Sequence, residues 1–134
     1  MIALDILDLK PIPGVEFLQL DFLDPSAPAR LKAMLGSGAA AKADVVLSDM
    51  AANATGHRQT DHLRIMALAE AAVEFAREIL APGGMFLCKV LQGGTEAKLL
   101  AELKREFATV KHVKPPASRT DSAELYLLAR GFRA

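Results

Sequence analysis

Short apolar runs alternate with helix-like segments along this sequence, and this alternation constrains the fold more than any other feature. The clearest unit begins with the apolar run Asp44–Ser48 and continues through a helix that starts at Thr60 or Asp61 and ends near Leu80. It closes with a second apolar run, Met85–Val90. Two strands joined by a crossover helix pair in parallel. We therefore expect an α/β fold with a doubly wound, mostly parallel sheet.

The same pattern extends to both sides of this unit. Upstream we expect a helix that ends near Leu35, before Gly36, and two strands, Ile2–Ile6 and Val15–Leu20. Downstream we expect a helix from Thr95 or Glu96 to Phe107 and two strands, Val110–Val113 and Leu125–Ala129. No helix separates the last two strands, which predicts an antiparallel pair at one edge of the sheet. No linker or repeat interrupts the pattern, so residues 1–134 are predicted to form a single domain.

The expected core follows from the spacing of apolar residues. The long helix carries an apolar stripe at helical spacing: Met66, Ala69, Val73, Ala76 and Leu80. The segment Pro82-Gly83-Gly84 is expected to end this helix before the next strand. The following helix is expected to bury Leu100, Leu103 and Phe107.

Composition excludes several classes of protein. Hydrophobic residues make up 51% of the chain, which argues against intrinsic disorder. The apolar runs are too short to span a membrane, and the apolar residues at the amino terminus are interrupted at Asp5, which is unlike a signal peptide. The single cysteine, Cys88, is expected to be a small buried hydrophobic residue, and no Cys/His cluster has the spacing of a metal site. These features predict a cytoplasmic protein without a metal.

Charge is distributed unevenly although the formal net charge is zero. Residues 1–50 hold 4 Lys+Arg and 7 Asp+Glu, and residues 104–134 hold 7 Lys+Arg and 3 Asp+Glu. A basic carboxyl-terminal part is typical both of a surface that binds a phosphate backbone and of a solvated surface. Tyr126 and Phe132 are candidates for stacking on bases, although core packing is favoured for Tyr126.

Polar residues follow several of the predicted strands. Asp5, Asp21 and Asp49 each stand at the carboxyl end of an apolar run. Ligands of open α/β sheets bind beyond these ends, so the three carboxylates are candidate site residues. Asp is also common in helix caps and turns, which is the structural alternative for Asp49.

Two further residues stand out for their surroundings. Lys89 lies within an otherwise apolar strand, and Glu124 directly precedes the last strand. Burying an unpaired ammonium group is costly, so an inward Lys89 needs carboxylate partners, for which Asp49 and Glu124 are the candidates. The equally favoured alternative is that Lys89 extends outward at the strand end.

Four segments of the sequence resemble the FtsJ/RrmJ family of ribosomal RNA methyltransferases. They are DVVLSDMAAN at residues 44–53, LAPGGMFLCKV at 80–90 with Gln92-Gly93, SRTDSAELY at 118–126, and LDILDLKPIPGVEFLQLDFLD at 4–24. LAPGG is common among methyltransferases, whereas the segments together, in this order, are specific. The resemblance implies a Rossmann-like class I methyltransferase sheet that binds S-adenosyl-L-methionine.

The resemblance also implies an activity and roles for individual residues. Its reaction is methylation of a uridine ribose 2′-hydroxyl in large-subunit ribosomal RNA. By the match of motifs, Asp49, Lys89 and Glu124 correspond to catalytic residues. Asp5 corresponds to the acid that holds the cofactor ribose, Asp21 to the acid near the adenine amino group, and Asp49 also lies near the methionine part.

The sequence departs from the family pattern at its start. The family places a catalytic lysine, the first sheet strand and a glycine-rich cofactor loop before the segment that matches Met1, so we expect a sheet that lacks its first strand. One alternative is therefore an inactive fragment or an RNA-binding remnant, and another, a dehydrogenase-like domain, lacks its glycine fingerprint. A missing middle strand exposes unpaired edges, which predicts self-association or direct pairing of the flanking strands.

Overall fold

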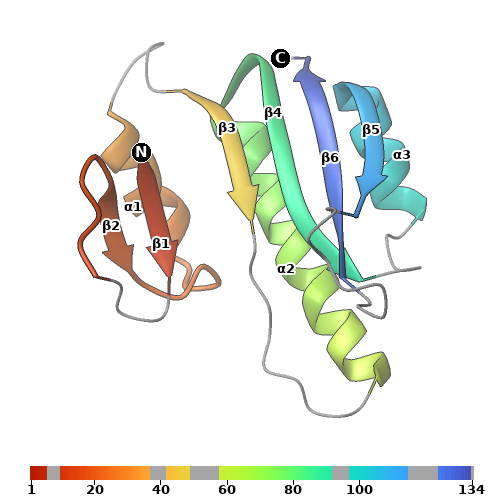
Figure 1. Cartoon of the computed structure of the whole chain (residues 1–134), viewed down its shortest axis with the longest axis horizontal. Coiled ribbons are helices and arrows are strands. Elements are labelled where there is room, and N and C mark those ends of the chain that lie inside the picture. Colours follow the sequence, from red (N-terminus) through yellow and green to blue (C-terminus); the bar gives the residue numbers. More distant parts are fainter. Residues whose placement is uncertain (6–9, 37–41, 49–57, 92–96, 115–123, 134) are drawn as a thin grey trace. The chain divides into compact units, whose positions relative to one another are not determined.

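The computed structural model describes residues 1–5, 10–36, 42–48, 58–91, 97–114 and 124–133. The chain divides into two compact units, Met1–Lys42 and Ala43–Ala134, each of which is described here by itself (Figure 1). The structure does not test whether the two units together form the single domain expected from the sequence, which stays a prediction.

The first unit contains two parallel strands and a short helix. Strand β1 (Ile2–Asp5) pairs with β2 (Glu16–Gln19) from Ile2 opposite Glu16 to Asp5 opposite Gln19. Helix α1 (Ala27–Leu35) follows and ends at Gly36, whose φ of 105° suits glycine. The upstream strands and helix predicted from the sequence are therefore confirmed. The two aspartates that follow apolar runs here, Asp5 and Asp21, lie at the carboxyl ends of neighbouring strands.

The second unit is built on a mixed sheet with strand order β3-β4-β6-β5 (Figure 1). Its elements in chain order are β3 (Ala43–Ser48), α2 (Arg58–Ile79), β4 (Leu80–Leu91), α3 (Ala97–Glu106), β5 (Phe107–Val113) and β6 (Glu124–Phe132). β3 and β4 are parallel, whereas β6 runs antiparallel to both β4 and β5. The predicted parallel unit and the antiparallel edge pair are confirmed, with the last strand inserted between β4 and β5.

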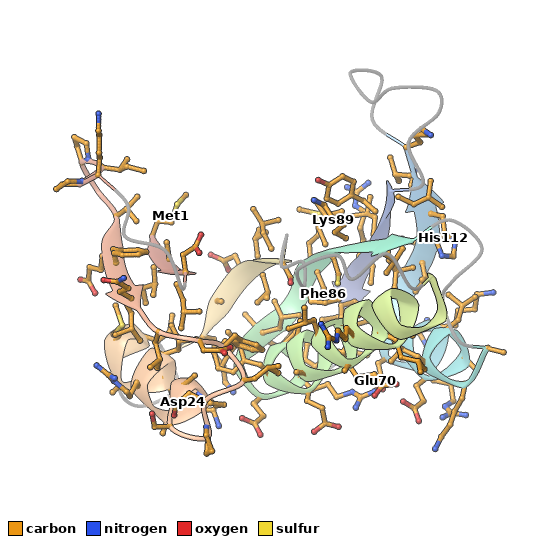
Figure 2. The ribbon with its side chains drawn as sticks, turned by 90° about the horizontal axis from the view of Figure 1, so that it is seen from below. Met1, Asp24, Glu70, Phe86, Lys89 and His112 are labelled. Carbon is orange, nitrogen blue, oxygen red and sulfur yellow. The ribbon has the colours of Figure 1, made fainter. Side chains whose placement is uncertain are left out.

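Helices α2 and α3 lie on one face of this sheet and form the core with it (Figure 2). On β4, Phe86 points toward the helices and Lys89 lies on the opposite face (Figure 2). The predicted stripe of the long helix is buried in full: Met66, Ala69, Val73, Ala76 and Leu80. Cys88 is also buried, as expected. The core of this unit therefore lies between the two helices and the face of the sheet that they cover.

The boundary between α2 and β4 differs from the prediction. Pro82-Gly83-Gly84 was expected to separate the helix from the strand, but β4 begins at Leu80, directly after Ile79. Ala43 pairs with Leu80 and Val45 with Met85, so the register shifts by several residues on the β4 side. The extra residues form an irregularity within the strand, where the φ of 84° at Gly83 is accessible to glycine.

The two final strands are longer than predicted. β5 begins at Phe107, which was expected to belong to the preceding helix, and β6 continues to Phe132. These two residues pair in register, both side chains are buried, and their ring centroids are 5.2 Å apart. Their contact favours an extended backbone over another helical turn. Phe132 is therefore a core residue and is not available to stack on a base.

Each unit has its own sheet within the described residues: β1 forms a ladder with β2, and β3 forms one with β4. The two expected consequences of a missing strand, direct pairing of the flanking strands and self-association, both stay predictions.

Candidate active site

Three strand ends meet at one end of the mixed sheet. The parallel β3–β4 ladder extends to Ser48 opposite Cys88, the residues that immediately precede Asp49 and Lys89 in the sequence. The antiparallel β4–β6 ladder places Lys89 opposite Tyr126 and Leu91 opposite Glu124. The carboxyl ends of β3 and β4 and the amino end of β6 therefore lie side by side. This end of the sheet is where open α/β sheets hold their ligands.

Lys89 lies half-buried on the face of the sheet that α2 and α3 leave uncovered (Figure 2). Its neighbours on β4, Phe86 toward the helices and Leu87 on its own face, show the regular alternation of a strand. Lys89 is thus not part of the core, and its alkyl stem can lie along the apolar sheet while the ammonium group extends outward. This agrees with the outward alternative that the sequence left open.

The other two predicted catalytic residues are described in part or not at all. Asp49 lies outside the described residues. Glu124 is the first residue of β6, and its backbone stands diagonally across from Lys89, because Lys89 pairs with Tyr126 two positions along. Diagonal neighbours on adjacent strands are about 7–8 Å apart, within reach of long side chains. The ladder thus brings the backbone positions of Lys89 and Glu124 together.

The register adds a residue that the sequence did not predict as part of this end of the sheet. Tyr126 is directly opposite Lys89 and is half-buried on the face away from the core cluster, although the sequence favoured core packing for it. Its position two residues after Glu124, on the same face of an antiparallel strand, was the available signal. The pairing register could not be predicted, because the long connection before β6 does not determine it.

The two remaining predicted carboxylates belong to the first unit. Asp5 is the half-buried last residue of β1, and its carbonyl oxygen accepts a 3.0 Å hydrogen bond from the amide of Leu20. Asp21 is exposed just after β2, and its Oδ1 accepts a 2.9 Å hydrogen bond from the amide of Leu23. The latter contact is an Asx turn. Both residues nevertheless stand at the carboxyl ends of paired parallel strands.

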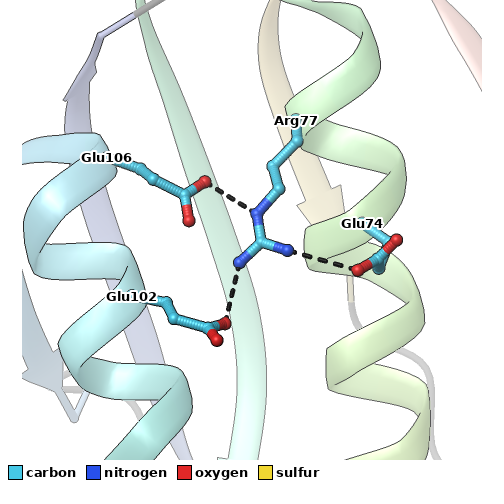
Figure 3. Close-up of polar contacts among 4 residues, drawn as sticks. All are labelled: Glu74, Arg77, Glu102 and Glu106. Carbon is cyan, nitrogen blue, oxygen red and sulfur yellow. Dashed lines mark hydrogen bonds and ion pairs between the residues drawn. The ribbon is translucent and has the colours of Figure 1, made fainter.

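A cluster of charged residues that the sequence did not predict lies on the helical side of the mixed sheet. Arg77 of α2 donates to Glu106 at 2.7 Å and to Glu102 at 3.0 Å on α3, and to Glu74 at 3.2 Å on its own helix (Figure 3). Partial burial of Arg77 alone would lower the pKa of its guanidinium. The hydrogen bonds that the guanidinium donates to Glu106 and Glu102 outweigh burial and raise that pKa. This cluster joins α2 to α3 and includes no residue of the strand ends.

Neither a metal site nor a membrane span is found in the described part of the chain. Its His, Cys, Asp and Glu residues form no group of three or more that could hold a metal ion. None of the helices in the described ranges is both long enough and apolar enough to cross a membrane.

Comparison with known proteins identifies the family. The model of the FtsJ-like methyltransferase family matches residues 1–132. The chain belongs to the FtsJ-like methyltransferases. The expected family and the Rossmann-like class I fold are thus confirmed.

Individual FtsJ-like relatives and solved structures agree with this assignment. The chain is 67% identical over 133 residues to ribosomal RNA large subunit methyltransferase E of Xanthobacter autotrophicus and 62% identical to that of Azorhizobium caulinodans. Both matches span 99% of this chain, but only 51% and 54% of the length of those relatives. The chain therefore spans about half the length of the curated relatives it matches.

The solved structures extend the comparison to the fold. A protein from Plasmodium falciparum described as a ribosomal RNA methyltransferase superposes with a TM-score of 0.81 at 28% identity. That match covers 98% of this chain and 71% of the other. A Streptococcus mutans protein described as a methyltransferase in complex with SAH has a TM-score of 0.52 at 12% identity over 98% of this chain and 70% of that one, which shows a shared fold alone.

Proposed function

We propose that this chain is the part of a ribosomal RNA methyltransferase that carries the catalytic strand ends, and that the enzyme methylates a uridine ribose 2′-hydroxyl of the large ribosomal subunit. The observation that carries the proposal is the meeting of three strand ends in the mixed sheet, next to Asp49, Lys89 and Glu124. The relatives support the proposal through the name that they share, ribosomal RNA large subunit methyltransferase E. Such an enzyme acts in the cytoplasm, where ribosomes are assembled.

The donor set at the strand ends suits S-adenosyl-L-methionine. Asp5 and Asp21, at the ends of paired parallel strands, offer carboxylate oxygens that can accept hydrogen bonds from ribose hydroxyls and from an adenine amino group. Asp49 is proposed to contact the methionine part. When bound, this cofactor supplies an electrophilic methyl group on a sulfonium, and the protein supplies orientation and electrostatics.

Lys89 is proposed to orient the ribose 2′-hydroxyl for transfer. A 2′-hydroxyl is a weak nucleophile that must be aimed at the methyl group and must lose its proton. A lysine can accept that proton only when it is neutral, and neighbouring carboxylates favour its charged form. With Asp49 and Glu124 as the proposed neighbouring carboxylates, Lys89 acts as a charged hydrogen-bond donor that positions the hydroxyl oxygen, and the hydroxyl proton passes to solvent water. The 2′-hydroxyl also makes RNA the substrate in preference to DNA.

The test separates cofactor binding from methyl transfer. Isothermal calorimetry of the 134-residue chain with S-adenosyl-L-methionine measures cofactor binding, and transfer of a radiolabelled methyl group to large ribosomal subunits measures activity. We expect Lys89→Ala to abolish transfer in a longer relative that carries this segment and to leave cofactor affinity within about twofold. The matched control, Lys10→Ala, removes an exposed lysine and is expected to change neither quantity.

Two outcomes contradict the proposal. Transfer that persists in Lys89→Ala removes the assigned role of Lys89. If the 134-residue chain binds no cofactor, the chain by itself is an RNA-binding remnant, and the cofactor site needs residues outside it.

A further inference from the structure

Helix α3 sorts its side chains by charge. Leu99 and Leu103 are buried against the sheet, and Glu102 and Glu106 are half-buried on the side facing α2. The exposed side consists of small and basic residues, namely Ala97, Lys98, Ala101, Lys104 and Arg105. At 100° per residue these five positions fall on one continuous face of the helix. The solvent face of α3 therefore carries three cations and no carboxylate.

Arg77 is the cause of this separation. Its guanidinium holds the carboxylate of Glu106 at 2.7 Å and that of Glu102 at 3.0 Å, both on the flank toward α2 (Figure 3). Without this bridge the carboxylate of Glu102 would be free to turn toward Lys98 and Arg105, which are its neighbours at helical spacing. The cluster thus keeps both acids of α3 away from its solvent face.

A fourth cation joins this face at the end of the helix. The amide of Arg133 donates a 2.8 Å hydrogen bond to the carbonyl of Glu106, the last residue of α3, and Arg133 is exposed. We name the set Lys98, Lys104, Arg105 and Arg133 the α3 basic surface. The exposed acids of the second unit's other helix, Glu70, Glu74 and Glu78, belong to a different element.

Stabilisation of the helix does not account for the whole surface. Lys104 and Arg105 lie in the last turn of α3, where positive charge complements the helix dipole. Lys98 lies in the first turn, where a positive charge opposes the dipole. Lys98 therefore does not stabilise α3 through the helix dipole.

We propose that the α3 basic surface binds the phosphate backbone of ribosomal RNA away from the methylated nucleotide. The proposal rests on the proposed function, which makes RNA the partner. Lysine and arginine side chains on a helix neutralise backbone phosphates and release counterions, which gives affinity and position without sequence preference. Such a contact would hold the substrate while the strand ends of the sheet act on one ribose.

The test compares two charge-matched double variants of the 134-residue chain. Lys104→Gln with Arg105→Gln removes two cations of the α3 basic surface, and Lys10→Gln with Arg64→Gln removes two exposed cations elsewhere. Fluorescence anisotropy with a labelled RNA hairpin gives Kd over a range of KCl concentrations. Each lost phosphate contact lowers the slope of log Kd against log salt by about 0.9, so we expect a decrease of about 2 in the first variant. We expect no change in the control.

A single variant separates binding from helix stability. Lys98→Gln removes a cation that opposes the dipole of α3, so its thermal midpoint should be unchanged or higher. Its RNA affinity should nevertheless fall, with a slope decrease of about 1. A merely structural effect would move stability and affinity in the same direction.

The outcomes distinguish this proposal from the proposed function. If the unmodified chain binds the hairpin and both double variants bind it equally well, the α3 basic surface is not the contact, while RNA remains the partner. If the unmodified chain does not bind RNA, both the surface and the partner proposed for this chain are wrong. A salt-independent affinity would likewise overturn a phosphate contact.

Discussion

Gly131 changes the face on which the end of β6 presents its side chains. Ala129 and Phe132 are both buried although they are three residues apart, whereas regular alternation would place them on opposite faces. The φ of 74° at Gly131 supplies the local twist, and an added Cβ there would lie 2.8 Å from the Cβ of Ala108. Phe132 reaches Phe107 because this one position is glycine.

Replacing Gly131 is expected to be costly for two separable reasons. We expect Gly131→Ala to lower the free energy of unfolding by about 1–3 kcal/mol, because alanine is strained at positive φ and its Cβ meets Ala108. Gly83 has a similar φ, and an added Cβ there would meet no neighbouring atom. Gly83→Ala should therefore lose only the stability that comes from the backbone strain. Adding Ala108→Gly should recover part of the loss at Gly131 and none at Gly83 in urea denaturation. Equal losses at both glycines would argue against the contact.

Asp24 is expected to titrate below the ordinary value of 3.8. The amide of Ser26 at 2.8 Å and its hydroxyl at 2.7 Å both donate to Oδ1, and Arg30 adds a smaller attraction, so the pKa of this carboxyl is lowered. A lowered pKa stabilises the folded state above about pH 3.8, and this contribution is lost as the pH falls below that value. Carboxyl chemical shifts in an NMR titration measure the midpoint. Ser26→Ala should move it part of the way back, and a midpoint at or above 3.8 would contradict the assignment.

Sequence reasoning located the candidate site residues but could not assemble them. Asp49 was found because it follows an apolar run, Lys89 because it lies within one, and Glu124 because it directly precedes one. The meeting of the strand ends depends on strand order and register, which the pattern of apolar residues does not determine, since β6 pairs with β4 across a long sequence separation. Tyr126 was placed in the core for the same reason: its face depends on a register that was not known.

The elements themselves were more predictable than their boundaries. Helix α2 follows its 3.6-residue apolar period, and every member of the predicted stripe is buried. The boundaries at Leu80 and Phe107 were wrong, because strand pairing with Ala43 and Phe132 extends both strands into residues that are compatible with helix. Local propensity gives way where a long-range partner is available.

Arg77 links helices α2 and α3 through an ion-pair cluster that no periodic pattern reveals. We expect Arg77→Ala to lower the free energy of unfolding by about 1–3 kcal/mol, because it removes three charge-assisted contacts and leaves Glu102 and Glu106 beside each other. Arg64→Ala removes an exposed arginine from the same helix and should cost less than about 0.5 kcal/mol. Urea denaturation of both variants is the measurement, and equal stability would show that the cluster contributes nothing.

Within the described residues of the second unit, β3 is an edge strand of the mixed sheet with apolar side chains in contact with solvent. On β3, Val45 and Leu47 are 44% and 66% exposed, and β3 pairs only with β4 within the described residues. An edge strand of this kind is a template for pairing with another chain. We predict that the 134-residue chain self-associates through this edge.

Charge at the edge should suppress that association. Leu47→Lys places a cation on the exposed face of β3, which natural edge strands use against pairing. We expect the weight-average mass in sedimentation equilibrium to fall toward that of the monomer. Leu63→Lys changes a residue of similar exposure, 62%, on α2 and serves as the control. A monomeric unmodified chain, or an equal effect of both variants, would contradict association through β3.

The strand order of the mixed sheet also affects how the protein is made. β6, the last strand of this sheet in chain order, lies between β4 and β5, and it supplies Leu127, Ala129 and Phe132 to the core. A nascent chain that has emerged only through residue 113 therefore exposes the facing edges of β4 and β5 with nothing between them. During translation the second unit cannot complete its core until residues 124–132 leave the ribosome, so its folding is coupled to the end of synthesis of this segment.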